Sequence, residues 1–440
     1  MTNLAWNVER VFPSAIADLN KLIAIPSISS MPEHDGDVAA CGDAVADLFR
    51  DLGAAEVKLL DGGGKPAVWA HFPGPEGTPT VLLYAHYDVQ PIGDASAWTS
   101  PAFEPTERDG RLYARGSADD KGGIAVHLAA LRAFDGRPPV GVKVFIEGEE
   151  EIGSPTMPVL LDRYRDELSA DVYVVADSVN WEVGKPSFTT SLRGVADCEV
   201  TVSTLAEGLH SGQFGGIAPD ALTALCRMLA TLHDEAGNVA IEGLVSGPGP
   251  DLEYPLDRLQ EETGMLDGVS QLGDGPLVER MWFRPAVSVL AIDATPVAEA
   301  SNTLIPSARA KVSVRLAPGQ DPEAAAAALE AHLRRNAPWG AHVDIVAGQS
   351  GAPSRIALDG ERADAARAAF REAFGTDVVE IGCGASIPIV AEFADRNPDA
   401  LVLVTAVTDP TSRMHGIDES VDLRDLAKAA LAETLLLERL

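Results

Sequence analysis

Residues 142–154 read VKVFIEGEEEIGS and join an apolar run directly to a cluster of acidic side chains. The run from Val142 to Ile146 is short and rich in β-branched residues, which predicts a buried strand. Four glutamates follow within five positions: Glu147, Glu149, Glu150 and Glu151. So much like charge at the end of a strand is held together either by water, in a solvated turn, or by bound cations, in a metal site.

The first and last parts of the chain alternate strand-like and helix-like patterns. Further apolar runs suited to strands occur at 80–85, 172–176 and 400–407. Amphipathic stretches suited to helices occur at 36–53, 122–134, 155–168, 361–374 and 421–440. This alternation predicts an α/β fold whose mostly parallel sheet carries helices on both faces.

The middle of the chain has a different rhythm. Strand-like and helix-like segments follow one another there in the order β-α-β-β-α-β, which is typical of ferredoxin-like folds. An acidic, glycine-rich insertion at about 236–283 interrupts this order. We therefore predict one discontinuous domain, formed by residues 1–186 and 353–440, and an inserted domain formed by residues 187–352.

Composition excludes several classes of protein. The net charge of -32 disfavours binding to nucleic acid and to anionic membranes, which both need basic surfaces. No apolar run is long enough to span a bilayer, and the first residues lack the basic start of a secretion signal, so we expect a cytoplasmic protein. The four cysteines are scattered without a CxxC pair, which argues against disulfides and a zinc-thiolate site.

Imidazole or carboxylate groups follow five of the predicted strands. In open α/β sheets, ligands lie beyond the carboxyl ends of the strands. Each group alone is more readily explained as a solvated loop residue or a structural histidine, but their coincidence favours a metal site. The residues are His86 and Asp88, Asp119 and Asp120, the glutamate cluster, Asp177, and His415.

A site with two divalent ions accounts for these groups. His86 and Asp177 are placed to hold one ion, Glu151 and His415 the other, and Asp119 or Asp120 to bridge them. Mixed imidazole and carboxylate ligands suit Zn²⁺, Mn²⁺ or Co²⁺ better than Ca²⁺ or Mg²⁺.

Two further acidic residues remain without a ligand role. Glu150 stays free to move protons beside the ions. Asp88 is placed to accept the second ring N–H of His86 and fix its tautomer.

Several motifs together resemble the M20 family of dinuclear metallopeptidases, which includes carnosinase-like dipeptidases, carboxypeptidase G2-like enzymes and amino-acid deacylases. They run in family order across most of the chain: HYDVQP at 86–91, W-x-x-P-x-F-E-P at 98–105, DGRLYARGSADDKGG at 109–123, EGEEEIGS at 147–154, Asp177, HSGQFGG at 210–216 and His415. The resemblance implies hydrolysis of an amide bond in dipeptides or other small substrates with a free carboxylate. It also implies two metal ions, foremost Zn²⁺, and an inserted domain that serves as lid and homodimer interface.

The resemblance assigns further roles. It makes Asp119 the bridging ligand and Glu150 the general base, and it predicts a cis peptide bond between Asp119 and Asp120. It implies that His210 stabilises the oxyanion in the active site of the partner subunit and that Arg315 binds the substrate carboxylate. Three more residues occupy substrate-lining positions: Asn302, Thr303 and Ser386.

Small departures from the family pattern occur at Ala114 and around Met414, and the second leaves the substrate open. An N-acyl-amino-acid deacylase would use the same machinery. A two-metal phosphoesterase is less suited to so acidic a site, which offers phosphate few cationic partners. A non-catalytic relative would be expected to have lost ligands or the base, and all six positions are present here.

Overall fold

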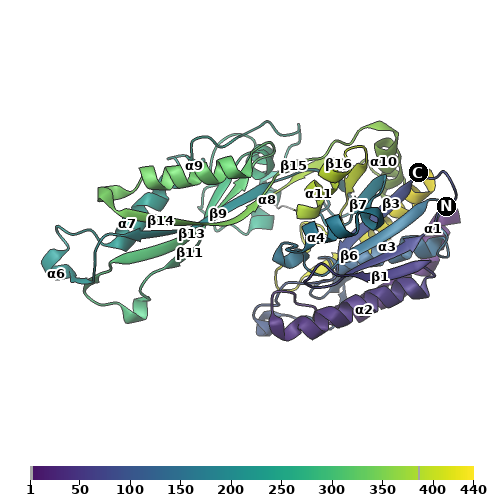
Figure 1. The fold of residues 1–440 in the computed structure, drawn as a ribbon. Coiled ribbons are helices and arrows are strands. Elements are labelled where there is room, and N and C mark those ends of the chain that lie inside the picture. The colour runs from purple at the N-terminus through teal and green to yellow at the C-terminus, as the bar shows by residue number, and fades with distance from the viewer. Residues whose placement is uncertain (1–2, 385–386) are drawn as a thin grey trace. The chain divides into compact units, whose positions relative to one another are not determined.

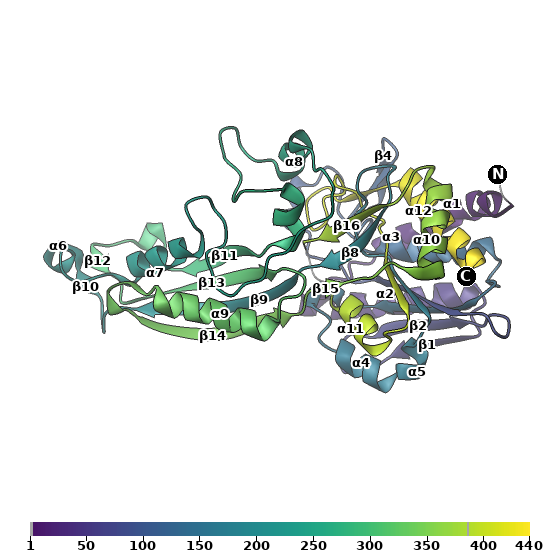
Figure 2. The ribbon, with the colours of Figure 1, turned by 90° about the horizontal axis from the view of Figure 1, so that it is seen from above.

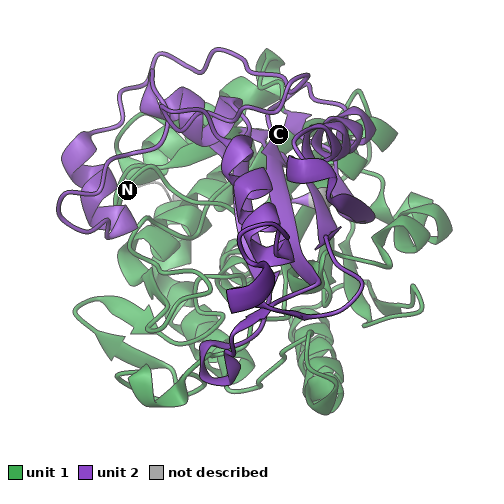
Figure 3. Cartoon of the chain, turned by 90° about the vertical axis from the view of Figure 1, so that its left-hand side faces the viewer, with its two compact units in different colours: residues 1–190, 356–381, 388–440 green, residues 191–355, 382–387 purple. Residues whose placement is uncertain are grey.

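The computed structural model of the protein describes residues 3–384 and 387–440, which form two compact units. Unit 1 comprises Met1–Thr190, Ile356–Ile381 and Pro388–Leu440, and unit 2 comprises Ser191–Arg355 and Gly382–Ile387 (Figure 3). The two main boundaries between the units lie at 190/191 and 355/356, a few residues after the predicted boundaries at 186/187 and 352/353. Arg193 of unit 2 donates its backbone N–H to the Cys383 carbonyl at 3.2 Å.

Unit 1 is built on a large mixed sheet with the strand order β1-β2-β6-β3-β7-β17-β8-β15, and β16 also pairs with β8. The strands of this sheet are β1 (Glu56–Leu60), β2 (Ala67–Phe72), β3 (Thr80–His86), β6 (Gly141–Glu147), β7 (Val172–Val175), β8 (Ser187–Leu192), β15 (Ser354–Arg355), β16 (Val379–Cys383) and β17 (Leu401–Val404). Of these, β15 and the last residues of β8 and β16 belong to unit 2. The four central strands, β6-β3-β7-β17, run parallel, as predicted, whereas β1, β2 and β15 add to the sheet as antiparallel strands. His86 lies opposite Glu147, so the carboxyl ends of β3 and β6 are level.

Helices cover both faces of this sheet (Figure 1). Val81 and Leu83 pack into one apolar cluster with Leu128 of α3, whereas Tyr84 and Tyr173 face Phe393 of α11 with ring centroids 6.5 and 4.1 Å away. Because both faces are covered, the central strands are apolar at almost every position. The helices of unit 1 are α1 (Asn3–Ile23), α2 (Asp35–Asp51), α3 (Lys121–Ala133), α4 (Met157–Arg163), α5 (Arg165–Leu168), α10 (Gly360–Phe374), α11 (Pro388–Arg396) and α12 (Leu423–Arg439).

A small sheet brings two distant loops of unit 1 together. It consists of β4 (Thr106–Arg108), β5 (Arg111–Tyr113) and β18 (Ser420–Asp422), in the order β18-β5-β4. Ser420 pairs with Tyr113, which places the loop before α12 beside the segment that leads into α3. Among the described residues, none of the helices combines the length and the apolar character needed to cross a membrane.

Unit 2 contains a four-stranded antiparallel sheet with the order β11-β13-β9-β14. Its strands are β9 (Gly194–Ser203), β11 (Ala286–Asp293), β13 (Ser307–Leu316) and β14 (His342–Gly351). Helices α7 (Ala221–Leu229) and α9 (Pro322–Arg335) cover one face, where even-numbered residues of β9 and β13 form the core (Figure 2). This is the predicted ferredoxin-like order. Short elements complete the unit: β10 (Leu209–His210), β12 (Thr303–Leu304), α6 (Ser211–Phe214) and α8 (Leu256–Thr263).

Candidate dinuclear metal site

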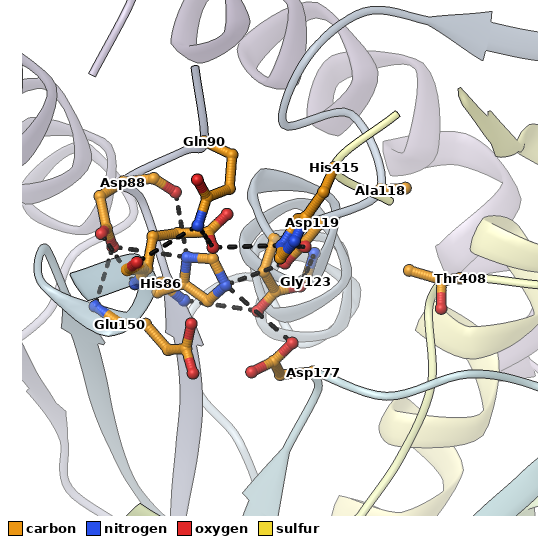
Figure 4. A network of polar contacts seen from close by, with 12 residues as sticks. His86, Asp88, Gln90, Ala118, Asp119, Gly123, Glu150, Asp177, Thr408 and His415 are labelled. Carbon is orange, nitrogen blue, oxygen red and sulfur yellow. Dashed lines mark hydrogen bonds and ion pairs between the residues drawn. The ribbon is translucent and has the colours of Figure 1, made fainter. Parts of the chain in front are cut away.

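The predicted ligands converge at the carboxyl ends of the parallel strands of unit 1 (Figure 4). They form two groups in which the candidate ligand atoms lie within 4.8 Å of one another. The first group is His86, Asp120 and Asp177, and the second is Asp119, Glu151 and His415. Each group combines imidazole with carboxylate, which is a donor set suited to zinc, manganese or cobalt.

Asp119 lies between the two histidines. Its Oδ1 is 3.1 Å from Nε2 of His86, and its Oδ2 is 3.0 Å from Nε2 of His415. Asp177 approaches the first histidine from another side, with its Oδ1 4.0 Å from the same Nε2 atom. A carboxylate that turns one oxygen to each group has the geometry of a bridging ligand.

Asp120 is engaged mainly with the backbone. Its side chain caps the N-terminus of α3 by accepting the N–H of Gly123 at 3.2 Å, and it also accepts the N–H of His86 at 3.4 Å. The peptide bond between Asp119 and Asp120 is cis, as predicted. The two aspartates therefore have different surroundings, and those of Asp119 fit the bridge better.

The orientation of His86 depends on its own turn. Nδ1 lies 3.0 Å from the backbone carbonyl of Asp88 and 3.4 Å from its carboxylate. The Asp88 carboxylate accepts the backbone N–H groups of Glu150, at 3.2 Å, and Glu151, at 3.1 Å. The nearer acceptor for the ring is the carbonyl. The buried carboxylate, for which we predicted this contact, lies beside the same nitrogen and also fixes the turn that presents the two glutamates.

The four glutamates at 147, 149, 150 and 151 lie in different environments. Glu147 is buried and accepts hydrogen bonds from the hydroxyls of Tyr84 and Ser154. Glu149 is also buried and accepts the backbone N–H of Lys65 at 2.7 Å. These two glutamates therefore anchor the loop rather than line the site.

Glu151 and Glu150 face the metal groups. Glu151 lies 3.2 Å from Nε2 of His415 and accepts a hydrogen bond from Gln90 at 2.8 Å. Within the described part of the chain, no group donates a hydrogen bond to the carboxylate of Glu150. Glu150 is thus available to accept a proton.

Several acidic and imidazole groups of the site have shifted pKa values. Burial, helped by the charges of Glu151 and Asp119 and opposed by His86, raises the pKa of Glu150 to about 7. Burial also raises the pKa of Asp177 well above its ordinary range. Hydrogen bonds to Asp119 and Glu151 raise the pKa of His415 to about 10. Divalent ions held by these groups would supply positive charge among the crowded carboxylates.

Sequence reasoning missed a buried ion pair that supports Asp119. One oxygen of Glu419 accepts the N–H groups of Ala118 and Asp119, at 3.0 and 3.1 Å. The other accepts a hydrogen bond from Arg115 at 2.6 Å, and Arg115 also donates to the Gly416 carbonyl at 3.3 Å. Arg115 belongs to the motif DGRLYARGSADDKGG at 109–123. Glu419 lies far away in the sequence, and no local sequence pattern indicates its role.

The predicted substrate residues belong to unit 2. His210 is exposed and lies opposite Thr303 in the β10–β12 pair, and the Asn302 carbonyl accepts the N–H of the next residue, Ser211, at 2.9 Å. These three predicted residues are therefore close neighbours. Arg315 lies on β13, and Ser386 falls outside the described residues.

Comparisons with known proteins identify the family. The profile described as "Peptidase family M20/M25/M40" matches residues 82–439. The chain belongs to this family. Among its relatives, the M20 protein is 35% identical to the cysteinylglycine-S-conjugate dipeptidase of Corynebacterium striatum, covering 98% of this chain and 95% of the relative. It is 27% identical to the Beta-Ala-His dipeptidase of Rattus norvegicus, over 88% of this chain and 85% of the relative.

Solved structures of similar proteins share the fold. The di-peptidase Dug1p from Saccharomyces cerevisiae superimposes with a TM-score of 0.86 at 23% identity, covering 100% of this M20 chain and 98% of that chain. Human carnosine dipeptidase 1 superimposes with a TM-score of 0.84 at 24% identity, and the superposition covers 99% of this chain and 98% of that chain. The similarity therefore extends over the whole chain, including both units.

Proposed function

We propose that this M20 peptidase hydrolyses dipeptides that carry a free C-terminal carboxylate, using two divalent metal ions and Glu150 as the general base. The observation that carries the proposal is the position of Asp119, whose two oxygens face His86 and His415. With Asp177 beside the first histidine and Glu151 beside the second, the five side chains supply ligands for two ions. Zn²⁺ is our first choice, with Mn²⁺ and Co²⁺ as alternatives.

Two ions held by these five side chains would polarise a substrate carbonyl and lower the pKa of bound water towards about 7. Glu150 then accepts the proton of the attacking water and passes it to the leaving amine as a general acid. Among the described residues, no group donates a hydrogen bond to the Glu150 carboxylate, which leaves its oxygens available for both steps. Asp88 orients the turn that carries Glu150, since its carboxylate holds the backbone N–H of that residue.

Residues of unit 2 complete the proposed site. His210, which is exposed, stabilises the oxyanion of a partner subunit in a homodimer that forms through unit 2. Its neighbours Asn302 and Thr303 line the substrate, together with Ser386. Arg315 binds the substrate carboxylate, a task suited to its planar, two-pronged guanidinium.

The alternative reaction is deacylation of N-acyl amino acids, which needs the same ions and the same base. Two observations favour dipeptides: the cysteinylglycine-S-conjugate dipeptidase is 35% identical over almost the whole chain, and the Beta-Ala-His dipeptidases follow it in similarity. Both relatives are named for dipeptide substrates.

A substrate panel combined with metal analysis tests the proposal. Purified protein loaded with Zn²⁺, Mn²⁺ or Co²⁺ is assayed on dipeptides, including Cys-Gly and β-Ala-His, and on N-acetyl amino acids. We expect turnover of dipeptides by the wild type, and loss of turnover in Glu150→Ala with about two ions per chain retained in both proteins. Full activity of Glu150→Ala would contradict the assignment of the base, and turnover of N-acetyl amino acids alone would favour the deacylase.

A further inference from the structure

The two histidines of the metal site are held in different ways. The side chain of His86 is fully buried, whereas that of His415 is 56% exposed. Packing therefore confines the first ring, but the direction of the second depends on the backbone of its own loop. His415 has a φ of 60°, in the left-handed region that residues other than glycine seldom adopt. The structure must hold this conformation for the ring to reach Asp119 and Glu151.

The loop that carries His415, residues 412–420, is closed at its base. Ser420 donates its backbone N–H to the Ser412 carbonyl at 2.9 Å. Arg111 of β5 donates to the hydroxyl of Ser420 at 2.9 Å and to that of Ser412 at 3.2 Å. These hydrogen bonds involve only the two ends of the loop, so its tip, residues 413–418, needs contacts of its own.

The backbone of this tip is unfavourable. Arg413, His415 and Asp418 have φ values of 54°, 60° and 58°. A positive φ crowds the side chain of an L-residue against its own backbone, and it persists only where surrounding contacts enforce it. A tip without such contacts would relax to other conformations, and the ring of His415 would turn with it.

Asp418 makes such contacts at the end of the tip. Its Oδ1 accepts the backbone N–H of Thr99 at 2.9 Å, and its Oδ2 accepts the hydroxyl of the same residue at 2.7 Å. Arg108 lies 4.0 Å from Oδ1 and adds a positive charge beside the carboxylate. Only 17% of the Asp418 side chain is exposed, so water competes little for these hydrogen bonds. We call this pair of residues the 99–418 clip.

Thr99 is a firm partner because its neighbour is buried. Trp98 donates its indole N–H to the Ile92 carbonyl at 2.9 Å, and its ring centroid lies 5.6 Å from the guanidinium carbon of Arg115. Arg115 in turn donates to the carbonyl of Gly416, at the longer distance of 3.3 Å. The clip therefore ties the tip of the loop to a segment that is itself fixed.

We propose that Asp418 is a positioning residue for His415: through the 99–418 clip it holds the imidazole in the direction of the second metal group. This inference rests on the proposed function, in which His415 is a ligand of one of the two ions. A ligand that is oriented before the ion arrives loses less freedom when it binds. Contacts that orient a ligand in this way change metal affinity about 10- to 100-fold in other proteins.

Hydrogen exchange in the metal-free protein tests the clip without any ion or substrate. Asp418→Gly removes both hydrogen bonds, and glycine adopts the positive φ without strain. We expect the amides of residues 412–420 to exchange about fivefold faster or more. Asp418→Asn should restore most of the protection, because its amide oxygen accepts the Thr99 N–H and its amide N–H donates to the Thr99 hydroxyl oxygen.

Asp109→Gly is the matched control for this experiment. Asp109 also has a positive φ, of 50°, but it is exposed in the turn between β4 and β5. Its substitution should leave the exchange of residues 412–420 unchanged. Unchanged exchange of this segment in folded Asp418→Gly, or equal acceleration in Asp109→Gly, would overturn the inference. If Asp418→Gly does not fold, Thr99→Val applies the same criterion, because it removes one of the two hydrogen bonds.

Metal binding shows whether the clip acts on His415. Titration of the Zn²⁺-loaded protein against a competing chelator measures the affinity of each ion. We expect Asp418→Gly to weaken the binding of one ion about tenfold or more and that of the other by less than about threefold, because the clip supports only one metal group. Equal weakening of both ions would overturn the positioning role. If the wild type binds the ions and shows these effects but hydrolyses no dipeptide, only the proposed function is contradicted.

Discussion

The carboxylate of Glu419 accepts the backbone N–H of Asp119 at 3.1 Å, across a sequence separation of 300 residues. The same side chain is paired with Arg115 at 2.6 Å, and all three residues are buried. Because Arg115 also donates to the Gly416 carbonyl, the pair joins the backbone of Asp119 to the residue that follows His415. The placement of Asp119 relative to His415, both members of the second group, thus depends on an ion pair between two residues outside that group.

The first prediction concerns this ion pair. Glu419→Gln keeps the shape of the side chain but leaves Arg115 buried without its counter-charge. We expect the free energy of unfolding to fall by about 3–5 kcal/mol and metal affinity to fall about 10- to 100-fold. Urea denaturation and titration against a competing chelator measure the two effects. Glu330→Gln, in the exposed pair with Arg334, is the control and should change stability by less than about 0.5 kcal/mol.

The second prediction separates the two metal positions. His415→Ala removes a ligand from one group only, whereas Asp119→Asn removes the negative charge shared by both. After dialysis against metal-free buffer, we expect about one tightly held ion per chain in His415→Ala and fewer in Asp119→Asn, against about two in the wild type. Elemental analysis of the dialysed proteins measures the number of metal ions per chain. Equal retention in Asp119→Asn and wild type would show that Asp119 does not bridge.

Sequence patterns predicted those parts of the site that depend on strand periodicity. His86, Glu151 and Asp177 follow apolar runs, and parallel strands bring their carboxyl ends to one edge of the sheet. Whether the His86 ring contacts the carbonyl or the carboxylate of Asp88 depends on the conformation of a turn only a few residues long. No periodic sequence pattern describes such a turn. Glu419 was missed for another reason, since its partners come from a segment about 300 positions earlier and only the tertiary fold brings them together.

The third prediction concerns pH and a buried pair away from the ligands. His127 of α3 lies 2.9 Å from Glu433 of α12, and its other nitrogen lies 3.1 Å from the Tyr84 carbonyl. Burial alone would lower the pKa of His127, but the charge and hydrogen bond of Glu433 raise it above its ordinary value. The pKa of His127 is therefore higher in the folded protein than in the unfolded chain, where it is about 6.5. This difference stabilises the folded protein fully at pH values below 6.5, and the stabilisation is lost as the pH rises through the pKa of the folded state.

The difference in stability between wild type and Glu433→Gln should therefore depend on pH. We expect Glu433→Gln to cost about 1.5–3 kcal/mol at pH 6, where the histidine is charged, and less at pH 9. Urea denaturation at the two pH values measures the change. A cost that is the same at both values would mean that the pair does not change its protonation over this range.

The fourth prediction concerns the glycine between two of the anchoring glutamates. A Cβ atom at Gly148 would come within 2.3 Å of the Tyr87 hydroxyl oxygen and 2.4 Å of the ring carbon that bears it. The Tyr87 ring is buried and its hydroxyl donates to the Pro66 carbonyl, so it has little room to move. We expect Gly148→Ala to displace the turn that carries Glu150 and Glu151, and to cost about 1–3 kcal/mol of stability.

Gly36 provides a matched control for this substitution. It lies in the first turn of α2, and a Cβ atom there would meet no atom within 4 Å. Gly36→Ala should therefore leave stability unchanged or raise it by about 0.4–1 kcal/mol, because alanine loses less backbone freedom on folding. Thermal unfolding and the metal content after dialysis distinguish the two variants. If Gly148→Ala retained both ions and the thermal midpoint of the wild type, the buried contacts of the turn at Glu147–Glu151 would not hold the turn in place.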